Sequence, residues 1–491
     1  MNDSPALAAS TVSLPRLLAV LIPAMLLVPI AADMVSLVLP LIAEQFTAST
    51  ARVAWVVTGF LLVCSVGIPI YGRFADRYSI RRLFTVSLAL FAIGSLLCAL
   101  APNLVVLVAG RMLMGAGGAA IPVLAIVAAA RLSPGDRAPV AIGFLGAAGG
   151  VGTAAGPVVG GVFGQLLGWP ALFWVMTAAA LVLIPAIRRV IPGDAPDDQR
   201  PFDLLGGLLL GAAAGLLLFG ITQSTTMGFG SPASWGVMSA GLAGAALFRW
   251  RTRAGAHPFV PPALFGNRGY VAAVAVIFLA MTVNLATLVL VPILVIEVNG
   301  LTPGEGSLVM IPGGLALAVT SLLAGRLGQR DVNAGSISLA GLTLIAAAAV
   351  LSSVTAGMSP VMAGLAVLAL GAGFALVVTA TTSAASQLLP SDQIGVGVGI
   401  FQGAQFLGAS TGPAVFAALL SARQAAGHDA FSPFHIGTAA AFSDAFLALT
   451  GVTALAFLAA TQLRKAVNQA RDDNPRTVHR AIAAPTAQSH D

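Results

Sequence analysis

Charge is scarce in this chain. Asp, Glu, Lys and Arg together make up 9% of its 491 residues, whereas a soluble globular protein carries about a quarter. Hydrophobic residues make up 58%. So few charges could not cover the surface of a soluble protein of this length. The composition therefore predicts a polytopic membrane protein.

Cysteine is nearly absent as well. Cys64 and Cys98 both lie in apolar runs, which excludes a disulfide framework or a cysteine-based metal site. The sequence also lacks a P-loop, a paired-histidine zinc motif and a Gly-x-Ser-x-Gly elbow. A membrane-embedded enzyme would need clustered His, Asp or Cys within its spans. We therefore expect no cofactor, no metal and no enzymatic activity.

Fourteen mainly apolar runs fit membrane spans, which take about 20 residues each. Their approximate ranges are 17–43, 53–72, 83–101, 104–130, 139–166, 170–187, 204–223, 234–249, 270–296, 303–325, 335–355, 359–387, 394–421 and 441–463. An even number places both termini on one side. Only Arg52, Arg111 and Arg423 of the 24 basic residues then fall elsewhere. The positive-inside rule makes that side cytoplasmic, so the net charge of +6 reflects topology rather than nucleic-acid binding.

The chain contains an internal repeat. Residues 131–159 align without a gap with residues 387–415, pairing Gly152 with Gly408 and Gly156 with Gly412. Two copies of six spans remain after the pair at about 204–249 is set aside, and parallel halves around a central pathway are typical of transporters. The predicted units are a cytoplasmic N-terminal segment (1–16), an N-terminal six-helix bundle (17–190), a linker with two extra helices (191–268), a C-terminal six-helix bundle (269–463) and a disordered cytoplasmic tail (464–491).

Glycine is concentrated in residues 143–164, where GVGTAAG comes close to a dinucleotide-binding fingerprint. That fingerprint needs a preceding strand and a later ribose-binding acid, and the sequence shows neither. Gly152, Gly156, Gly160 and Gly164 recur every fourth residue. The spacing predicts a face of small residues on which a second membrane helix packs closely.

Four motifs in order point to one family. The glycine run continues as Gly-x-x-x-Gly-Pro-x-x-Gly-Gly in the fifth span, "YGRFADRYSIRRL" lies between spans two and three, "AGRMLMGAGGAA" lies in span four and "ADMVSLVLPLIAEQF" in span one. Together they resemble the fourteen-helix drug:proton antiporters of the major facilitator superfamily. The matching residues are Asp33, Pro40, Gly72, Asp76, Arg77, Arg81, Arg82, Arg111, Gly115, Gly117, Gly152, Gly156, Pro157, Gly160 and Gly161.

The resemblance implies an all-α polytopic membrane protein with the major facilitator fold, two six-helix bundles plus two extra helices. It implies proton-coupled export of amphipathic or cationic drugs by alternating access, with small molecules and protons as partners. We expect a monomer in the cell (inner or plasma) membrane. The alternative is a transporter of the same fold that exports a lipid or one endogenous metabolite.

Asp33 is the first predicted coupling residue. It lies about 16 residues into span one, or ~24 Å along a helix. A carboxylate at that depth is costly, so it is expected to face a cavity and exchange a proton or attract a cation. The alternative is a carboxylate held by hydrogen bonds for helix packing.

Arg111 is the second. A buried arginine cannot be neutralised, so it needs Asp33, backbone carbonyls or water as partners. The resemblance makes it part of proton coupling; a snorkelling arginine is the alternative. In the repeat it aligns with Val367, and Asp76 aligns with Gln329. We therefore expect coupling and the conformational latch in the first half.

The predicted latch comprises Gly72, Arg73, Asp76, Arg77, Arg81 and Arg82, whose charges would hold helix ends together in one conformation. A solvated basic loop is the alternative. Glu297, where the family more often has Gln, is either a further coupling group or a solvated helix-end acid. Asn284, Thr287, Gln387, Gln402 and Gln405 either line the substrate pathway or make interhelical hydrogen bonds.

Overall fold

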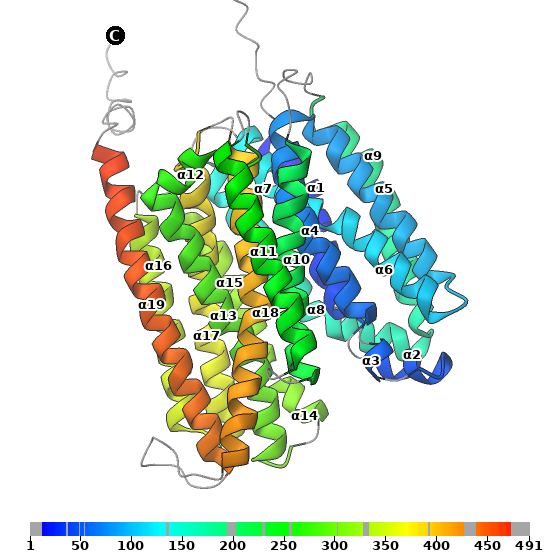
Figure 1. Ribbon diagram of the computed structural model, residues 1–491, viewed down its shortest axis with the longest axis vertical. Coiled ribbons are helices and arrows are strands. Elements are labelled where there is room, and N and C mark those ends of the chain that lie inside the picture. Colours follow the sequence, from blue (N-terminus) through cyan, green and yellow to red (C-terminus); the bar gives the residue numbers. More distant parts are fainter. Residues whose placement is uncertain are drawn as a thin grey trace, which may run out of the picture.

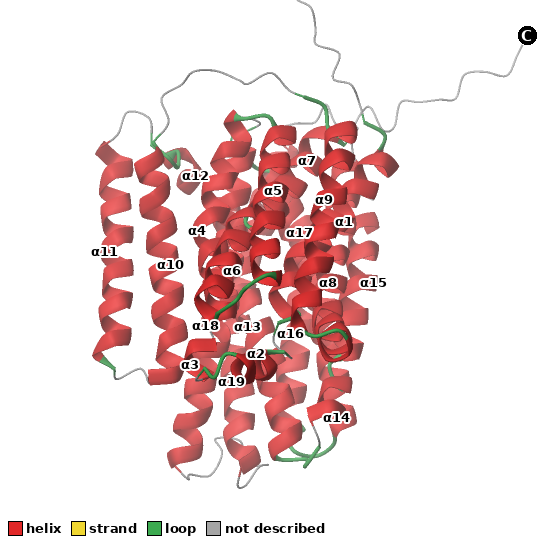
Figure 2. Cartoon of the chain, turned by 90° about the vertical axis from the view of Figure 1, so that its right-hand side faces the viewer, coloured by secondary structure: helices red, strands yellow, loops and turns green. Residues whose placement is uncertain are grey.

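The computed structural model describes residues 12–35, 38–48, 50–53, 55–133, 137–193, 203–227, 231–254, 258–301, 303–327, 333–390, 393–426 and 438–472. Within these ranges every regular element is a helix (Figure 2). The N-terminal helices are α1 (Leu14–Asp33), α2 (Leu39–Gln45), α3 (Thr50–Val53), α4 (Trp55–Arg77), α5 (Ile80–Ala99), α6 (Leu104–Gly118), α7 (Ala120–Leu132), α8 (Ala138–Leu166) and α9 (Trp169–Val190). The rest are α10 (Leu204–Met227), α11 (Pro232–Ala254), α12 (Pro262–Gly266), α13 (Arg268–Glu297), α14 (Pro303–Leu308), α15 (Ile311–Leu327), α16 (Ala334–Val354), α17 (Pro360–Gln387), α18 (Ile394–Ala426) and α19 (Thr438–Asp472).

Three of the expected continuous spans are broken in two. The run 17–43 forms α1 and α2, 104–130 forms α6 and α7, and 303–325 forms α14 and α15. A proline lies in the first turn of each second piece: Pro40 in α2, Pro122 in α7 and Pro312 in α15. Proline has no backbone N–H to continue the helix that precedes it and suits the first turn of a new one. Proline alone does not break a helix here, because Pro69 and Pro292 lie inside the continuous helices α4 and α13.

Ten helical stretches in the described chain are long and apolar enough to cross a membrane. Shorter apolar stretches, Val140–Gly152, Leu205–Leu217 and Ile311–Ala324, lie in α8, α10 and α15. Every expected run coincides with a helix or a broken helix. The count of fourteen spans stays a prediction.

The helices form two bundles, each with its own hydrophobic core. One core joins residues of α1 to α9, and the other joins residues of α13 to α19. In Figure 1 the blue and cyan bundle lies beside the yellow and red one. The internal repeat is visible in the packing: α8 lies on α1 in the first bundle, and α18 lies on α13 in the second.

The bundles meet along two seams, α4 against α18 and α8 against α15. The hairpin α10–α11 lies over the first seam, with α10 contacting both α4 and α18 (Figures 1 and 2). Gly211 and Gly215 let α10 approach Val66 of α4. Phe259, just after the hairpin, packs against Gly206 and Gly207 at the start of α10.

The C-terminal segment differs from its prediction. Helix α19 continues to Asp472, so residues 464–472 are helical rather than disordered. Leu463 is fully buried and Val467 packs against the same apolar cluster, which explains why the helix extends past Arg464. Residues 473–491 and 1–11 lie outside the described part of the chain.

Candidate functional site

Arg111 lies in α6 and is fully buried in the N-terminal bundle. Its Nε donates to the Val56 carbonyl (2.8 Å) and its Nη1 to the Ala31 carbonyl (2.9 Å). The guanidinium carbon lies 4.3 Å from the ring centroid of Phe60. Its Nη2 has no hydrogen-bond partner among the described residues. The side chain therefore does not reach a membrane surface, as a snorkelling arginine would, and its Nη2 group keeps its N–H donors available.

Asp33 is the last residue of α1 and is half-buried. It therefore lies at a helix end rather than in the middle of a continuous span, because α1 and α2 are separate helices. Ala31, whose carbonyl binds Arg111, is two residues away. No hydrogen bond or ion pair within 4 Å joins Asp33 to Arg111 in the described structure, although the two charges are close enough to interact. Hydrogen bonds that would hold Asp33 for packing alone are likewise not present among the described residues.

The small-residue face of α8 lies on α1. A methyl group at Gly156 would lie 2.7 Å from Cβ of Asp33, and one at Gly152 would lie 2.5 Å from Cγ of Pro29. Gly160 faces the backbone of Met34 in the same way. The antiporter-motif glycines thus permit the approach of α8 to the segment that carries Asp33. Pro157 and Gly161 lie within α8, and their surroundings are outside the described structure.

The second bundle repeats this arrangement without the charges. Methyl groups at Gly408 and Gly412 would strike the carbonyls of Phe278 and Thr282 in α13. Thr282 thus occupies the place that Asp33 occupies in the first bundle. Val367, the counterpart of Arg111, is a buried apolar residue. Gln329, the counterpart of Asp76, is not among the described residues.

Asp76 joins the two bundles where α4 ends and α5 begins, a region called the Asp76 end below. Its Oδ1 accepts a hydrogen bond from the backbone N–H of Gly395 (2.6 Å), and its Oδ2 accepts one from Val396 (2.7 Å). Both amides belong to the first turn of α18, where a helix N-terminus attracts negative charge. Arg131 at the end of α7 completes the site, with its Nη2 2.6 Å from Oδ1 of Asp76.

Gly72 allows this contact. A methyl group on Gly72 would lie 2.5 Å from the Gly395 carbonyl and 2.8 Å from Cα of Gly399. Glycine is therefore required on both sides of the closest approach between α4 and α18.

The arginines of the predicted latch are dispersed. Arg73 is close enough to Asp76 to interact with its charge. The Arg77 guanidinium lies 5.8 Å from the ring centroid of Tyr78, and that of Arg81 lies against Gly193. Arg82 is exposed. Asp76, Gly72 and Arg73 of the predicted set therefore gather at the junction with α18.

Glu297 lies at the exposed end of α13, far along the chain from Asp33, Asp76 and Arg111. Its Oε2 accepts a hydrogen bond from Nε2 of Gln424 in α18 (3.3 Å). This setting favours the solvated helix-end acid over a second coupling group.

Four of the five predicted pathway residues are buried or half-buried within α13 and α18, and the fifth, Gln387, is exposed. Asn284 and Gln402 are buried and Gln405 is half-buried, in α13 and α18. Thr287 is buried and donates to the Val283 carbonyl of its own helix. Gln387 is exposed at the end of α17 and donates to Ser383 (3.1 Å).

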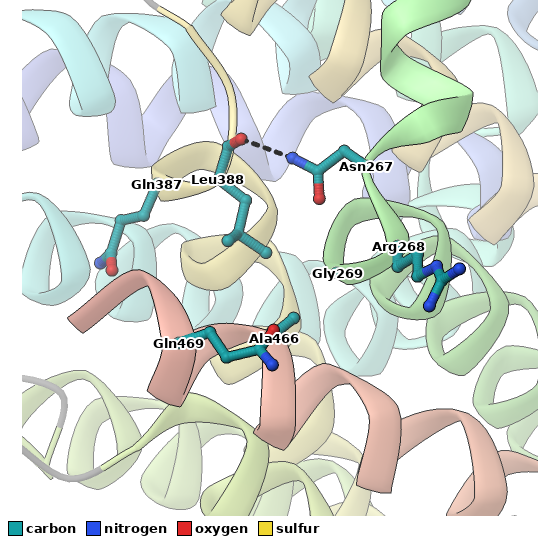
Figure 3. A pocket seen from close by; sticks show the side chains of 7 residues that line it. All are labelled: Asn267, Arg268, Gly269, Gln387, Leu388, Ala466 and Gln469. Carbon is teal, nitrogen blue, oxygen red and sulfur yellow. Dashed lines mark hydrogen bonds between the residues drawn. The ribbon is translucent and has the colours of Figure 1, made fainter. Parts of the chain in front are cut away.

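Gln387 lines an open pocket of about 390 Å³ at the Asp76 end, between α13, α17 and α19 (Figure 3). Asn267, Arg268, Gly269, Leu388, Ala466 and Gln469 complete the lining. In Figure 3 the Asn267 side chain reaches across to the Leu388 carbonyl (2.9 Å). Gln387 therefore belongs to this peripheral pocket and not to a pathway between the bundles.

The charged partners of Asp76 and Asp444 were not predicted from the sequence. Arg131 entered only the charge count, yet it pairs with Asp76. Asp444 in α19 is buried and pairs with Arg423 of α18, whose Nε lies 2.9 Å and whose Nη2 lies 2.5 Å from its Oδ2. The sequence carried a signal for this pair. Asp444 lies inside a predicted span, and Arg423 is one of the few arginines expected at the same end of the bundle.

Known proteins place the chain among transporters. The Major Facilitator Superfamily model matches residues 21–413. The multidrug resistance protein Stp of Mycobacterium tuberculosis (strain CDC 1551 / Oshkosh) is 31% identical over 391 residues, covering 79% of this chain and 72% of that protein. The tetracenomycin C resistance and export protein of Streptomyces glaucescens is 29% identical over 411 residues, covering 83% and 76%.

Solved structures agree in fold. The human organic anion transporter MFSD10 superposes with a TM-score of 0.67 at 15% identity, covering 91% of this chain and 99% of that one. The proton:xylose symporter XylE superposes with a TM-score of 0.63 at 17% identity, covering 91% and 94%. The family match over most of the chain and the helical architecture lead to one conclusion: this protein belongs to the major facilitator superfamily, as a multi-pass membrane transporter of small molecules rather than an enzyme.

Proposed function

We propose that this protein is a proton-coupled antiporter that exports amphipathic or cationic drugs by alternating access. The relatives named for multidrug resistance and for tetracenomycin export support the substrate class. The low charge of the chain, with 9% charged residues, is compatible with apolar compounds that partition into the bilayer. We place the Asp76 end in the cytoplasm, because the basic residues gather on that side.

The proximity of Asp33 to Arg111 carries the proposal for coupling. Arg111 is held by carbonyls of α1 and α4 but keeps Nη2 without a described partner. Asp33 lies two residues beyond one of those carbonyls. A small movement of α1 would let the ionised carboxylate reach the free N–H, and protonation of Asp33 would release it. One proton bound from outside and released inside would thereby reset the helix for each exported substrate.

Alternating access requires the two bundles to separate at one end while they close at the other. The Asp76 contacts with α18 support a closed state at the Asp76 end. Opening that end breaks two charge-assisted hydrogen bonds and separates Asp76 from the helix terminus, so Asp76 is the proposed latch. Gly72 permits the same closure by backbone contact.

Transport in proteoliposomes with an imposed pH gradient tests the proposal. The purified protein is screened against cationic dyes, biocides and lipids. Uptake that follows the proton gradient and collapses with a protonophore supports antiport. Gradient-independent movement would refute coupling, and movement of lipids alone would replace drugs by lipids as the substrate.

A further inference from the structure

Tyr270 in the first turn of α13 holds the helix end to which Asp76 binds. Its hydroxyl donates to the Gly397 carbonyl in the first turn of α18 (2.7 Å), and its side chain is 1% exposed. The ring belongs to an apolar cluster that includes Val396 and Phe401 of α18. The bond therefore fixes α18 to α13 within the C-terminal bundle, next to the Gly395 and Val396 amides.

The beginning of α13 is itself firmly placed. The Asn267 side chain accepts from the Tyr270 N–H (3.1 Å) and caps the helix, while its Nδ2 donates to the Leu388 carbonyl at the end of α17 (Figure 3). A methyl group on Gly269 would lie 2.7 Å from Cβ of Ala466 in α19 and 3.0 Å from Cδ1 of Leu388. The hydroxyl of Tyr270 thus projects from a point that α17 and α19 also fix.

The first turn of α18 needs such support. The first turn and the start of the second read Ile-Gly-Val-Gly-Val-Gly over residues 394–399, and each glycine inside a helix costs about 1 kcal/mol relative to alanine. Gly395 and Gly399 face Gly72 of α4 at distances that exclude a side chain. The glycines that allow the bundles to touch therefore also weaken the start of α18. The Gly395 and Val396 amides there must be aligned in order to bind Asp76.

We propose that Tyr270 is a positioning residue: it holds the glycine-rich first turn of α18 so that the Gly395 and Val396 amides point at Asp76. The inference rests on the proposed latch and names the residue in the opposite bundle that makes the latch effective. Without the hydroxyl, the first turn loosens, the two amides lose their alignment and the closed Asp76 end becomes less populated.

Spin labels measure that population. Cysteines introduced at exposed positions Arg188 of α9 and Lys465 of α19 report the distance between the bundles at the Asp76 end, while Cys64 and Cys98 are buried away from the reagent. The variants are Y270F, D76N and the double variant, in lipid nanodiscs. Ser353→Ala is the matched control, because that buried hydroxyl also donates to a carbonyl of a neighbouring helix, that of Ser443 in α19, and not to the first turn of α18.

Because Y270F removes one buried hydrogen bond, we expect it to raise the ratio of open to closed molecules about fivefold. In the D76N background Y270F adds no further opening, and Ser353→Ala leaves the distances unchanged in both backgrounds. Hydrogen exchange in the peptide spanning 394–399 should accelerate in Y270F and not in the control.

The remaining outcomes contradict the positioning role of Tyr270, the latch role of Asp76, or both. A wild-type distance distribution or unchanged exchange in Y270F overturns the positioning role, as does an equal effect of Y270F with and without Asp76. If D76N itself leaves the distances unchanged, the latch of the proposed function fails. Any opening by Y270F would then act through another route, which also removes the positioning role.

Discussion

Gly156 of α8 lies against Asp33 of α1 so closely that a methyl group on the glycine would approach the aspartate Cβ to 2.7 Å. The antiporter-motif glycine and the proposed coupling carboxylate are therefore parts of one helix contact. Any side chain at position 156 must push α1 away from α8, together with the Ala31 carbonyl to which Arg111 is bound. The packing motif and the proposed coupling site are therefore mechanically linked.

Gly156→Ala is expected to impair transport strongly. Overpacking a tight helix contact costs about 1–3 kcal/mol, and here it also displaces Asp33. The measurement is initial transport rate in proteoliposomes, normalised to folded protein. Gly149→Ala is the matched control, because its methyl group would lie at an ordinary 3.8 Å from Cε of Met25. Equal rates for both variants and wild type would contradict the link.

Asp33→Asn is expected to abolish transport driven by a pH gradient while leaving a folded protein. Asparagine keeps the shape that Gly156 accommodates but cannot ionise, so it cannot attract the free Arg111 donor as a charge. Exchange of labelled for unlabelled substrate, which needs no proton, should persist. Glu297→Gln is the comparison: that side chain is exposed and bonded to Gln424, so coupling should be retained. Coupled uptake by the Asp33→Asn variant would remove Asp33 from the mechanism.

The glycine spacing of α8 and the internal repeat were readable from the sequence because both are periodic along the chain. The identity of the facing helix was not readable: spacing predicts a face, but only folding places Asp33 opposite Gly156. The breaks in three helices coincide with Pro40, Pro122 and Pro312. The sequence could not locate them from proline alone, because Pro69 and Pro292 lie inside continuous helices.

Charge pairs were harder to predict than helices. The charge count placed Arg131 and Asp76 at the same end, but no periodic pattern selects one arginine among several there. Arg81, which matches the family motif, lies against Gly193, while Arg131 binds the carboxylate. Gln387 shows the same limit: its polarity was evident, but its place at the outside of the bundle depends on where α17 ends.

Arg131→Gln is expected to weaken the closed state less than Asp76→Asn does. The Arg131 side chain is 26% exposed, so water can replace part of what it contributes to the ion pair with Asp76. Asp76 would still accept from the two amides of α18. Asp76→Asn weakens both of those charge-assisted bonds, each worth about 1.5–3 kcal/mol. Distances between the bundles at the Asp76 end rank the two variants. A larger opening in Arg131→Gln would show that the ion pair, not the helix terminus, holds the junction.

The buried pair of Arg423 and Asp444 is expected to stabilise the C-terminal bundle without taking part in transport. Asp444→Asn leaves the Arg423 charge with a weaker partner in a largely buried site, since the two side chains are 17% and 4% exposed. Breaking such a pair costs up to about 3–5 kcal/mol, whereas replacing both members by apolar groups is often neutral. The midpoint of thermal unfolding in detergent should therefore fall in Asp444→Asn and largely recover in the double variant Arg423→Met, Asp444→Leu. Transport below the unfolding range should match wild type in the double variant. Loss of transport in a stable double variant would instead make this pair part of the transport cycle.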